Sequence, residues 1–170
     1  MIEVLTSNTP NGKKITIMLE EIGYEYKITK IDISKDEQFE DKFKKLSPFR
    51  KIPVIIDHKK NISLFESGAI LIYLGELSGK FYDEKKRTVI NQWLMGQMGY
   101  IGPMLGQHHQ FHHYHPGKSK FGEERYFKIC ERIYKELDER LSTTEYLAYD
   151  EYTIADIATF PWIARHEWHD

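Results

Sequence analysis

The chain has 170 residues, a length typical of one ordinary domain or two small ones. Its 24 basic and 26 acidic side chains give a formal net charge of −2, which excludes the strong positive field of a nucleic-acid-binding protein. No stretch approaches the roughly 18 apolar residues that cross a membrane, and the start does not resemble a secretory signal. Because a lone Cys130 excludes an internal disulfide framework, we expect a cytoplasmic protein.

The first half of the chain alternates between strand and helix patterns. The predicted order is β-α-β-α-β-β-α, with strands at 2–5, 24–33, 51–56 and 62–64 and helices at 10–22, 36–46 and 66–78. The opening β-α-β unit predicts two parallel strands. We expect Tyr26, Ile28, Ile31 and Ile33 to point inward from the second strand, and Phe39, Phe43 and Leu46 from the second helix.

The second half carries helical patterns alone. We expect a helix around residues 93–101, weakened by nearby glycines, another over 121–141, and a last one from Thr153 to the end of the sequence. Thr153 and Asp156 have the spacing of a capping box. These patterns predict an α/β domain over residues 1–80 and an all-α domain over residues 84–170.

Thr9-Pro10-Asn11-Gly12 stands at the start of the first predicted helix. Thr9 can cap the helix, and Pro10 suits its first turn. The unpaired N–H groups at a helix N-terminus favour an anion such as a thiolate, and Thr9 and Asn11 would add donors. Taken alone, this motif is more often a simple capped turn.

Two other segments can likewise be interpreted either as ligand-binding or as purely structural features. A proline opening a strand, as in Ile52-Pro53, is where thioredoxin-like folds place a cis-proline, although most X–Pro bonds are trans. Ser67 at the start of a helix can receive a carboxylate, and Glu66 can pair with an ammonium group. The simpler reading is that Glu66 merely complements the helix dipole.

Five of the eight histidines lie between His108 and His115. The pairs His108/His112 and His109/His113 have a spacing that can hold zinc on a helix, but no neighbouring Cys, Asp or Glu supplies another ligand. We therefore expect no metal site, and interpret this segment as the lining of a polar cleft or as plain surface. Cys130 lacks a CxxC partner and reads as a buried, inert thiol.

Taken together, these segments resemble the bacterial nu-class glutathione transferases, which act as glutathione-dependent disulfide-bond oxidoreductases. The likeness extends to the globular domain of the yeast nitrogen-catabolite regulator. It runs from end to end of the sequence and rests on TPNGKKITIMLEE (9–21), SPFRKIPVIID (47–57), SLFESGAILIYL (63–74), QWLMGQMGYIGPMLGQHHQF (92–111) and YTIADIATFPW (152–162). The resemblance implies a thioredoxin-like N-terminal domain with a cis-proline, then a helical domain that is incomplete relative to the family.

The resemblance also implies residue roles. Thr9 and Asn11 would hold the glutathione sulfur, with Ser7 a weaker alternative, because the family lacks a catalytic tyrosine, serine or cysteine. The peptide would contact Gln38, the backbone of Ile52, and Glu66 with Ser67 at its γ-glutamyl end. Arg125 would reach across the cleft to a glutathione carboxylate.

The predicted activity is glutathione-dependent disulfide reduction or glutathione transfer, with glutathione as co-substrate and no further cofactor. The second substrate would be a small disulfide or an electrophile, and the family implies a homodimer. A non-catalytic glutathione-binding or regulatory module is the alternative, because fold does not dictate function.

Overall fold

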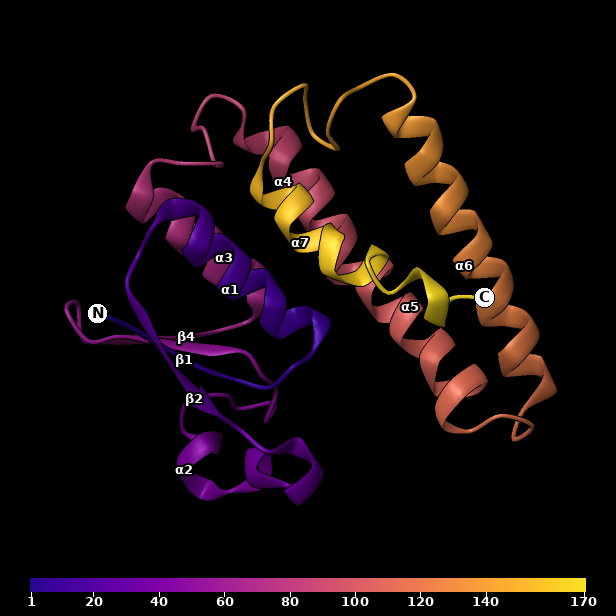
Figure 1. Cartoon of the computed structure of the whole chain (residues 1–170), viewed down its shortest axis with the longest axis horizontal. Helices are drawn as coiled ribbons and strands as arrows, with labels where there is room; N and C mark the ends of the chain where they lie inside the picture. The colour runs from indigo at the N-terminus through magenta and orange to yellow at the C-terminus, as the bar shows by residue number, and fades with distance from the viewer. The chain divides into compact units, whose positions relative to one another are not determined.

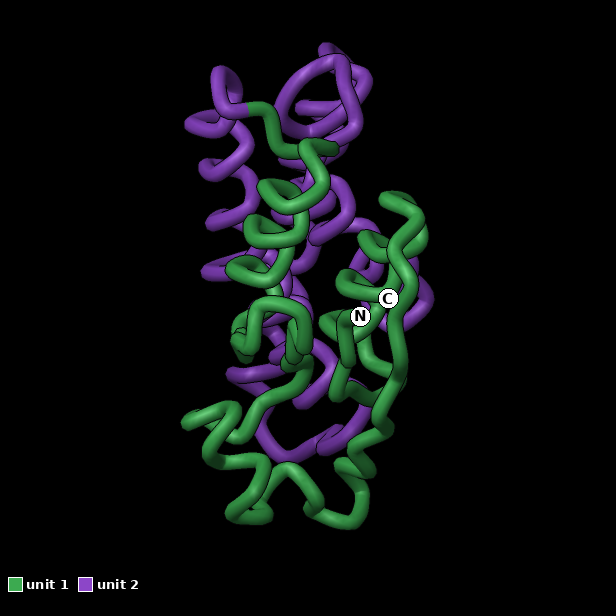
Figure 2. The backbone as a smooth tube through the Cα atoms, turned by 90° about the vertical axis from the view of Figure 1, so that its left-hand side faces the viewer, with its two compact units in different colours: residues 1–83 green, residues 84–170 purple.

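A computed structural model describes every residue, Met1–Asp170. The chain forms two compact units, Met1–Asp83 and Glu84–Asp170, which Figure 2 shows in different colours. The first unit combines a sheet with helices and the second contains helices alone, which confirms the predicted fold class. None of the helices is both long enough and apolar enough to span a membrane.

The first unit is built on a four-stranded sheet in the order β2-β1-β3-β4. Its strands are β1 (Ile2–Thr6), β2 (Tyr26–Lys30), β3 (Val54–Asp57) and β4 (Ile62–Phe65). β1 and β2 are parallel, as the β-α-β pattern predicts, whereas β3 is antiparallel to both β1 and β4. Helices α1 (Pro10–Ile22) and α3 (Ser67–Ser78) pack side by side (Figure 1), and the short α2 (Asp41–Lys44) lies between β2 and β3 in sequence.

Alternation along the strands divides the core of this unit between the two faces of the sheet. Leu5 and Val54 pack with Phe43 of α2 on one face. Their neighbours Val4 and Ile55 therefore point to the opposite face, and both are fully buried. Helix α1 begins at its Thr9 cap and ends at Gly23, whose φ of 72° is left-handed, as the sequence predicts.

The second predicted strand and helix need correction. β2 is an edge strand, and the side chains of Ile28 and Ile33 are 53% and 41% exposed although we expected them to point inward. The predicted helix over 36–46 is instead a 3-10 turn, Glu37–Phe39, followed by the single turn of α2, and another 3-10 turn, Ile33–Lys35, precedes them. Asp36 between the turns has a φ of 60°, which no α-helix accommodates, and Phe39 is consequently exposed.

The second unit contains α4 (Arg87–Gly96), α5 (Gly102–His109), α6 (Lys120–Leu141) and α7 (Ile154–Ile163). Two π-helical segments, Gln97–Ile101 and Gln110–Tyr114, continue α4 into α5 and α5 beyond its end. The core of the unit packs residues of α5, α6 and α7 together, among them Leu105, Ile133 and Trp162.

The last helix begins as predicted but does not reach the end of the sequence. Thr153 and Asp156 form the predicted capping box at its start. The helix then ends at Ile163, where the Ala164 N–H donates to the Phe160 carbonyl at 2.8 Å, and a 3-10 turn follows at His166–Trp168. Arg165 leaves the helical conformation with φ −102° and ψ 28°, so the expectation of a continuing helix is wrong.

Candidate functional site

The register of the sheet brings three loops to one end of the first unit. Leu5 of β1 pairs with Val54 of β3, which in turn pairs with Phe65 of β4. The segment leading to Thr9, the Ile52-Pro53 bond and Glu66 each lie within a few residues of this row. The sheet therefore gathers residues from positions 9, 52 and 66 that are far apart in the sequence.

The first of these loops forms the N-terminus of α1. Thr9 has an extended backbone, and its Oγ1 accepts a hydrogen bond from the Gly12 N–H at 3.1 Å. Because the oxygen serves as the acceptor, the Thr9 hydroxyl can still donate its own hydrogen to an anion. Gly12 is required here, since a Cβ would lie 2.6 Å from the Ser7 carbonyl oxygen. Asn11, half-buried in the first turn, completes the predicted motif.

The second loop carries the Ile52-Pro53 peptide bond, which is cis, as predicted. Pro53 is buried, whereas Ile52 is half-buried and packs at the edge of the Leu5 cluster. The Ile52 backbone stands directly before β3, next to the row that pairs with β1 and β4.

The third loop ends at the N-terminus of α3. Glu66 adopts φ 67° and ψ 113°, a strained conformation for a residue with a side chain, and its carboxylate makes no capping hydrogen bond. Its side chain is exposed, while Ser67 is buried at the first position of the helix. An exposed carboxylate beside a helix N-terminus suits a ligand that carries an ammonium and a carboxylate group on one carbon.

Gln38 lies in the second 3-10 turn after β2. Its Nε2 donates weakly to Asp36 at 3.4 Å, but its Oε1 is buried without any hydrogen-bond donor. A buried acceptor without a donor costs about 1–3 kcal/mol, so such atoms usually accept a hydrogen bond from an ordered water or a ligand. A peptide N–H group would supply such a donor.

A buried lysine near this site is a residue that the sequence reasoning missed. Lys14 of α1 is only 1% exposed, and burial lowers its pKa from 10.5 to about 7 despite the opposing effect of the Glu66 carboxylate. This electrostatic coupling links the first turns of α1 to the start of α3. The available signal was a lysine directly preceding Ile15, the first residue of the apolar stripe of α1.

Arg125 lies in the other unit, on α6, where its side chain is exposed and its guanidinium stacks 6.0 Å from the ring centroid of Tyr126. Its predicted reach to a glutathione carboxylate therefore stays a prediction. Cys130 on the same helix is 3% exposed in the core of its unit, and burial raises its thiol pKa to about 11, in agreement with the inert thiol expected.

Comparisons with known proteins identify the family. Residues 5–76 match the N-terminal domain of glutathione S-transferase, and residues 108–169 match its C-terminal domain. The chain is 44% identical to disulfide-bond oxidoreductase YfcG of Escherichia coli over 96% of its own length and 79% of that protein. This chain belongs to the glutathione S-transferase superfamily.

Two further comparisons indicate the same superfamily. The chain is 39% identical to disulfide-bond oxidoreductase YghU of Escherichia coli, over 96% of its own length and 60% of that protein. Among solved structures, it is similar to a glutathione transferase from Pseudomonas putida with one glutathione disulfide bound per subunit. That match has a TM-score of 0.89 and 41% identity, and covers 96% of this chain and 74% of the other.

The histidine-rich segment differs from the sequence expectation. His108 is fully buried and His109 is 4% exposed, so neither lies on the surface or lines an open cleft. His109 Nε2 lies 2.9 Å from His169 Nε2, and His169 Nδ1 lies 2.7 Å from the Tyr134 hydroxyl. The ring of His109 also stacks on that of His169, so most of this segment packs against the end of the chain.

Proposed function

We propose that this chain is a glutathione-dependent disulfide reductase in which the thiolate of glutathione is the reactive sulfur. The observation that carries the proposal is the N-terminus of α1, where the Thr9 hydroxyl, which can still donate a hydrogen, and Asn11 lie at the positive end of the helix dipole. No protein thiol competes for the role, because the one cysteine is buried in the other unit with its pKa raised to about 11.

The remaining residues of the site would bind the peptide. Glu66 would pair with the γ-glutamyl ammonium group, and Ser67 at the start of α3 would receive the adjacent carboxylate. The buried Oε1 of Gln38 would accept an N–H of the peptide, and the Ile52 backbone would pair with it. Arg125 would bind a glutathione carboxylate, as the family resemblance implies.

The chemistry proceeds by thiol–disulfide exchange. The bound thiolate attacks one sulfur of the substrate disulfide, forms a mixed disulfide, and releases the other sulfur as a thiolate that takes up a proton. A second glutathione then attacks the mixed disulfide, releasing the second substrate thiol and glutathione disulfide. The helix terminus and the two side chains stabilise the thiolate, and a moderate lowering of its pKa suffices because nucleophilicity falls with pKa.

Two broader features complete the proposal. We infer a homodimer, as the family resemblance implies, and a cytoplasmic location, which the single unpaired cysteine supports. The second substrate would be a small disulfide, and conjugation of glutathione to an electrophile is the competing activity of the same thiolate.

The test is glutathione-dependent reduction of bis(2-hydroxyethyl) disulfide by the purified chain, with its fold checked by circular dichroism in the same preparation. Asn11→Ala should lower kcat/KM about tenfold, the loss expected for one hydrogen bond to a charged sulfur. Thr9→Val should act similarly, although it also removes the helix cap.

Thr16→Ala is the matched control, because Thr16 lies further along α1 and its hydroxyl only donates to the Lys13 carbonyl at 3.2 Å. An unchanged rate and affinity for Asn11→Ala would contradict its role. A folded protein that binds glutathione but reduces no disulfide would instead support conjugation, measured with chlorodinitrobenzene, or a non-catalytic glutathione-binding module.

A further inference from the structure

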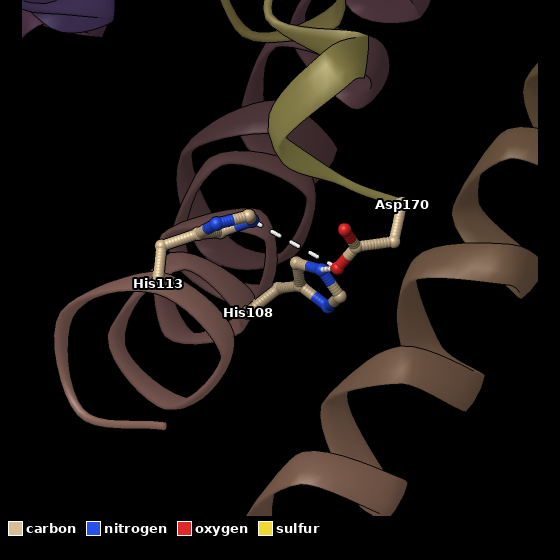
Figure 3. Close-up of side chains that lie close together, drawn as sticks. All are labelled: His108, His113 and Asp170. Carbon is tan, nitrogen blue, oxygen red and sulfur yellow. Dashed lines mark hydrogen bonds and ion pairs between the residues drawn. The ribbon is translucent and has the colours of Figure 1, made fainter.

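A second group of polar side chains lies wholly within the Glu84–Asp170 unit and has no part in the proposed reaction. One carboxylate oxygen, Oδ2 of Asp170, faces three imidazole rings. It lies 2.9 Å from His108 Nε2, 3.4 Å from His112 Nδ1 and 3.8 Å from His113 Nε2. Figure 3 shows His108 and His113 directed at this carboxylate.

The π-helical segment Gln110–Tyr114 brings these rings together. In a regular α-helix, residues five positions apart point roughly 140° away from each other. Here the His115 N–H donates to the Gln110 carbonyl at 2.9 Å, five residues back, and the local widening turns His113 toward the face that carries His108. Their ring centroids lie 6.1 Å apart, and the π-helix is a device found often at functional sites.

His112 packs against this group without adding a ligand atom to it. Its ring stacks on that of His108, with centroids 4.0 Å apart and an interplanar angle of 13°, so the two rings do not converge on one ion. Its Nε2 lies 3.0 Å from the backbone carbonyl oxygen of Glu123, which can only accept, so Nε2 carries a hydrogen. His112 therefore supports the ring of His108.

The distances and donor types point to zinc. Ligand bonds of about 2.0–2.2 Å place two ligand atoms of a tetrahedral Zn²⁺ site roughly 3.3 Å apart. The ligand atoms of His108, His113 and Asp170 all lie within 4.8 Å of one another, so a shift of about 1 Å would close the site. Imidazole nitrogens with one carboxylate suit zinc, whereas Mg²⁺ and Ca²⁺ prefer oxygen alone.

We propose that His108, His113 and Asp170 bind a Zn²⁺ ion, with a water molecule in the fourth position. Metal binding replaces the contact of His113 Nε2 with the Trp168 carbonyl, now 2.8 Å long, and moves the proton of that ring to Nδ1. His108 makes one polar contact, through Nε2, and its Nδ1 has no partner, so no second interaction holds its tautomer. Asp170, 43% exposed, leaves an entry path for the ion.

Sequence reasoning dismissed a metal here because no carboxylate was near the histidines. The missing ligand comes from Asp170, which the fold places beside α5 although it comes 57 positions after His113. A bound ion would fasten Asp170 to α5 and the π-helical segment. This role is independent of the proposed glutathione chemistry.

The experiment is calorimetric titration of the metal-free 170-residue chain with ZnCl₂, paired with Co²⁺ titration followed by visible absorption. We expect one ion per chain, a dissociation constant in the micromolar range or below, and the intense visible bands of four-coordinate Co²⁺. Asp170→Asn, at an exposed position that tolerates substitution, should weaken binding at least tenfold, and His113→Gln should do the same.

His115→Gln is the matched control, because His115 lies in the same segment, is exposed and makes none of these contacts. Each variant is checked by circular dichroism, so that a loss of fold is not mistaken for a loss of ligand. Absence of zinc binding to the folded chain would overturn the proposal. So would binding that Asp170→Asn and His113→Gln weaken no more than His115→Gln does, since this would indicate diffuse surface histidines.

Discussion

Lys14 is buried, and the free-energy cost of burying its charged ammonium group should make the stability of the fold depend on pH. The residue is 1% exposed, and burial lowers its pKa from 10.5 to about 7 even though the Glu66 carboxylate acts in the opposite direction. A fall of this size corresponds to about 5 kcal/mol between the two protonation states. Replacing the ammonium group while keeping the apolar stem, as in Lys14→Met, isolates this contribution.

The direction in which the stability changes with pH follows from the number of protons that the folded and unfolded chains bind. Below pH about 7, Lys14 is protonated in both the folded and the unfolded chain, so the folded state bears the whole cost of the buried charge. Between pH about 7 and 10.5 the unfolded chain holds a proton that the folded chain has released, and stability rises with pH. The Lys14 contribution should therefore recover by about 2 kcal/mol between pH 7 and pH 9.

The assay is urea unfolding of the native chain and of Lys14→Met at pH 7, 8 and 9, followed by circular dichroism. The difference in unfolding free energy between the two proteins removes the effect of other titrating groups. This difference should shift by about 2 kcal/mol in favour of the native chain from pH 7 to pH 9. Lys13→Met, at the exposed neighbouring position, should show no such shift. A pH-independent difference for Lys14→Met would refute the assignment of a buried, partly deprotonated lysine.

Three further predictions concern the site and the fold. Gly12→Ala should lower the free energy of unfolding by about 1–3 kcal/mol, because its Cβ would lie 2.6 Å from the Ser7 carbonyl oxygen; an unchanged urea midpoint would contradict this. Thr153→Ala should cost about 1 kcal/mol by opening the capping box with Asp156, again measured by urea unfolding, and a loss below 0.3 kcal/mol would count against the box. Arg125→Ala should weaken glutathione binding about tenfold with an unchanged melting temperature, since the side chain is exposed; equal calorimetric affinities would remove Arg125 from the site.

Local patterns identified most of the elements because their signals are contained in short windows. The N-terminal cap of α1 at Thr9, the C-terminal glycine at Gly23 and the capping box at Thr153 depend only on neighbouring residues, and all three are confirmed. Predictions failed where tertiary position decides burial. Ile28 alternates correctly for an inward side chain, but β2 lies at the edge of the sheet and leaves it exposed.

For the candidate glutathione site, the sequence likewise predicted which residues could take part but not that they lie close together. The sequence alone identified Thr9, Asn11, Glu66 and Ser67 as groups that could hold an anion or an amino-acid end, and the family resemblance added their roles. Only the pairing of Leu5 with Val54 and of Val54 with Phe65 brings these loops to one end of the sheet. The buried state of Lys14 likewise depends on packing, since a lysine in an amphipathic helix is ordinarily exposed.

The sequence by itself determined the order of the elements, the caps of the helices and the chemical groups available to a thiolate, because each depends on local spacing and residue type. Tertiary structure alone decided which of those groups meet. Asp170 lies beside His108 of α5 and His113 of the π-helical segment although it comes 57 positions after His113, and the π-helical turn aligns rings that a regular helix would separate. Spacing along the chain carries no information on such contacts, because folding brings together side chains that share no local pattern.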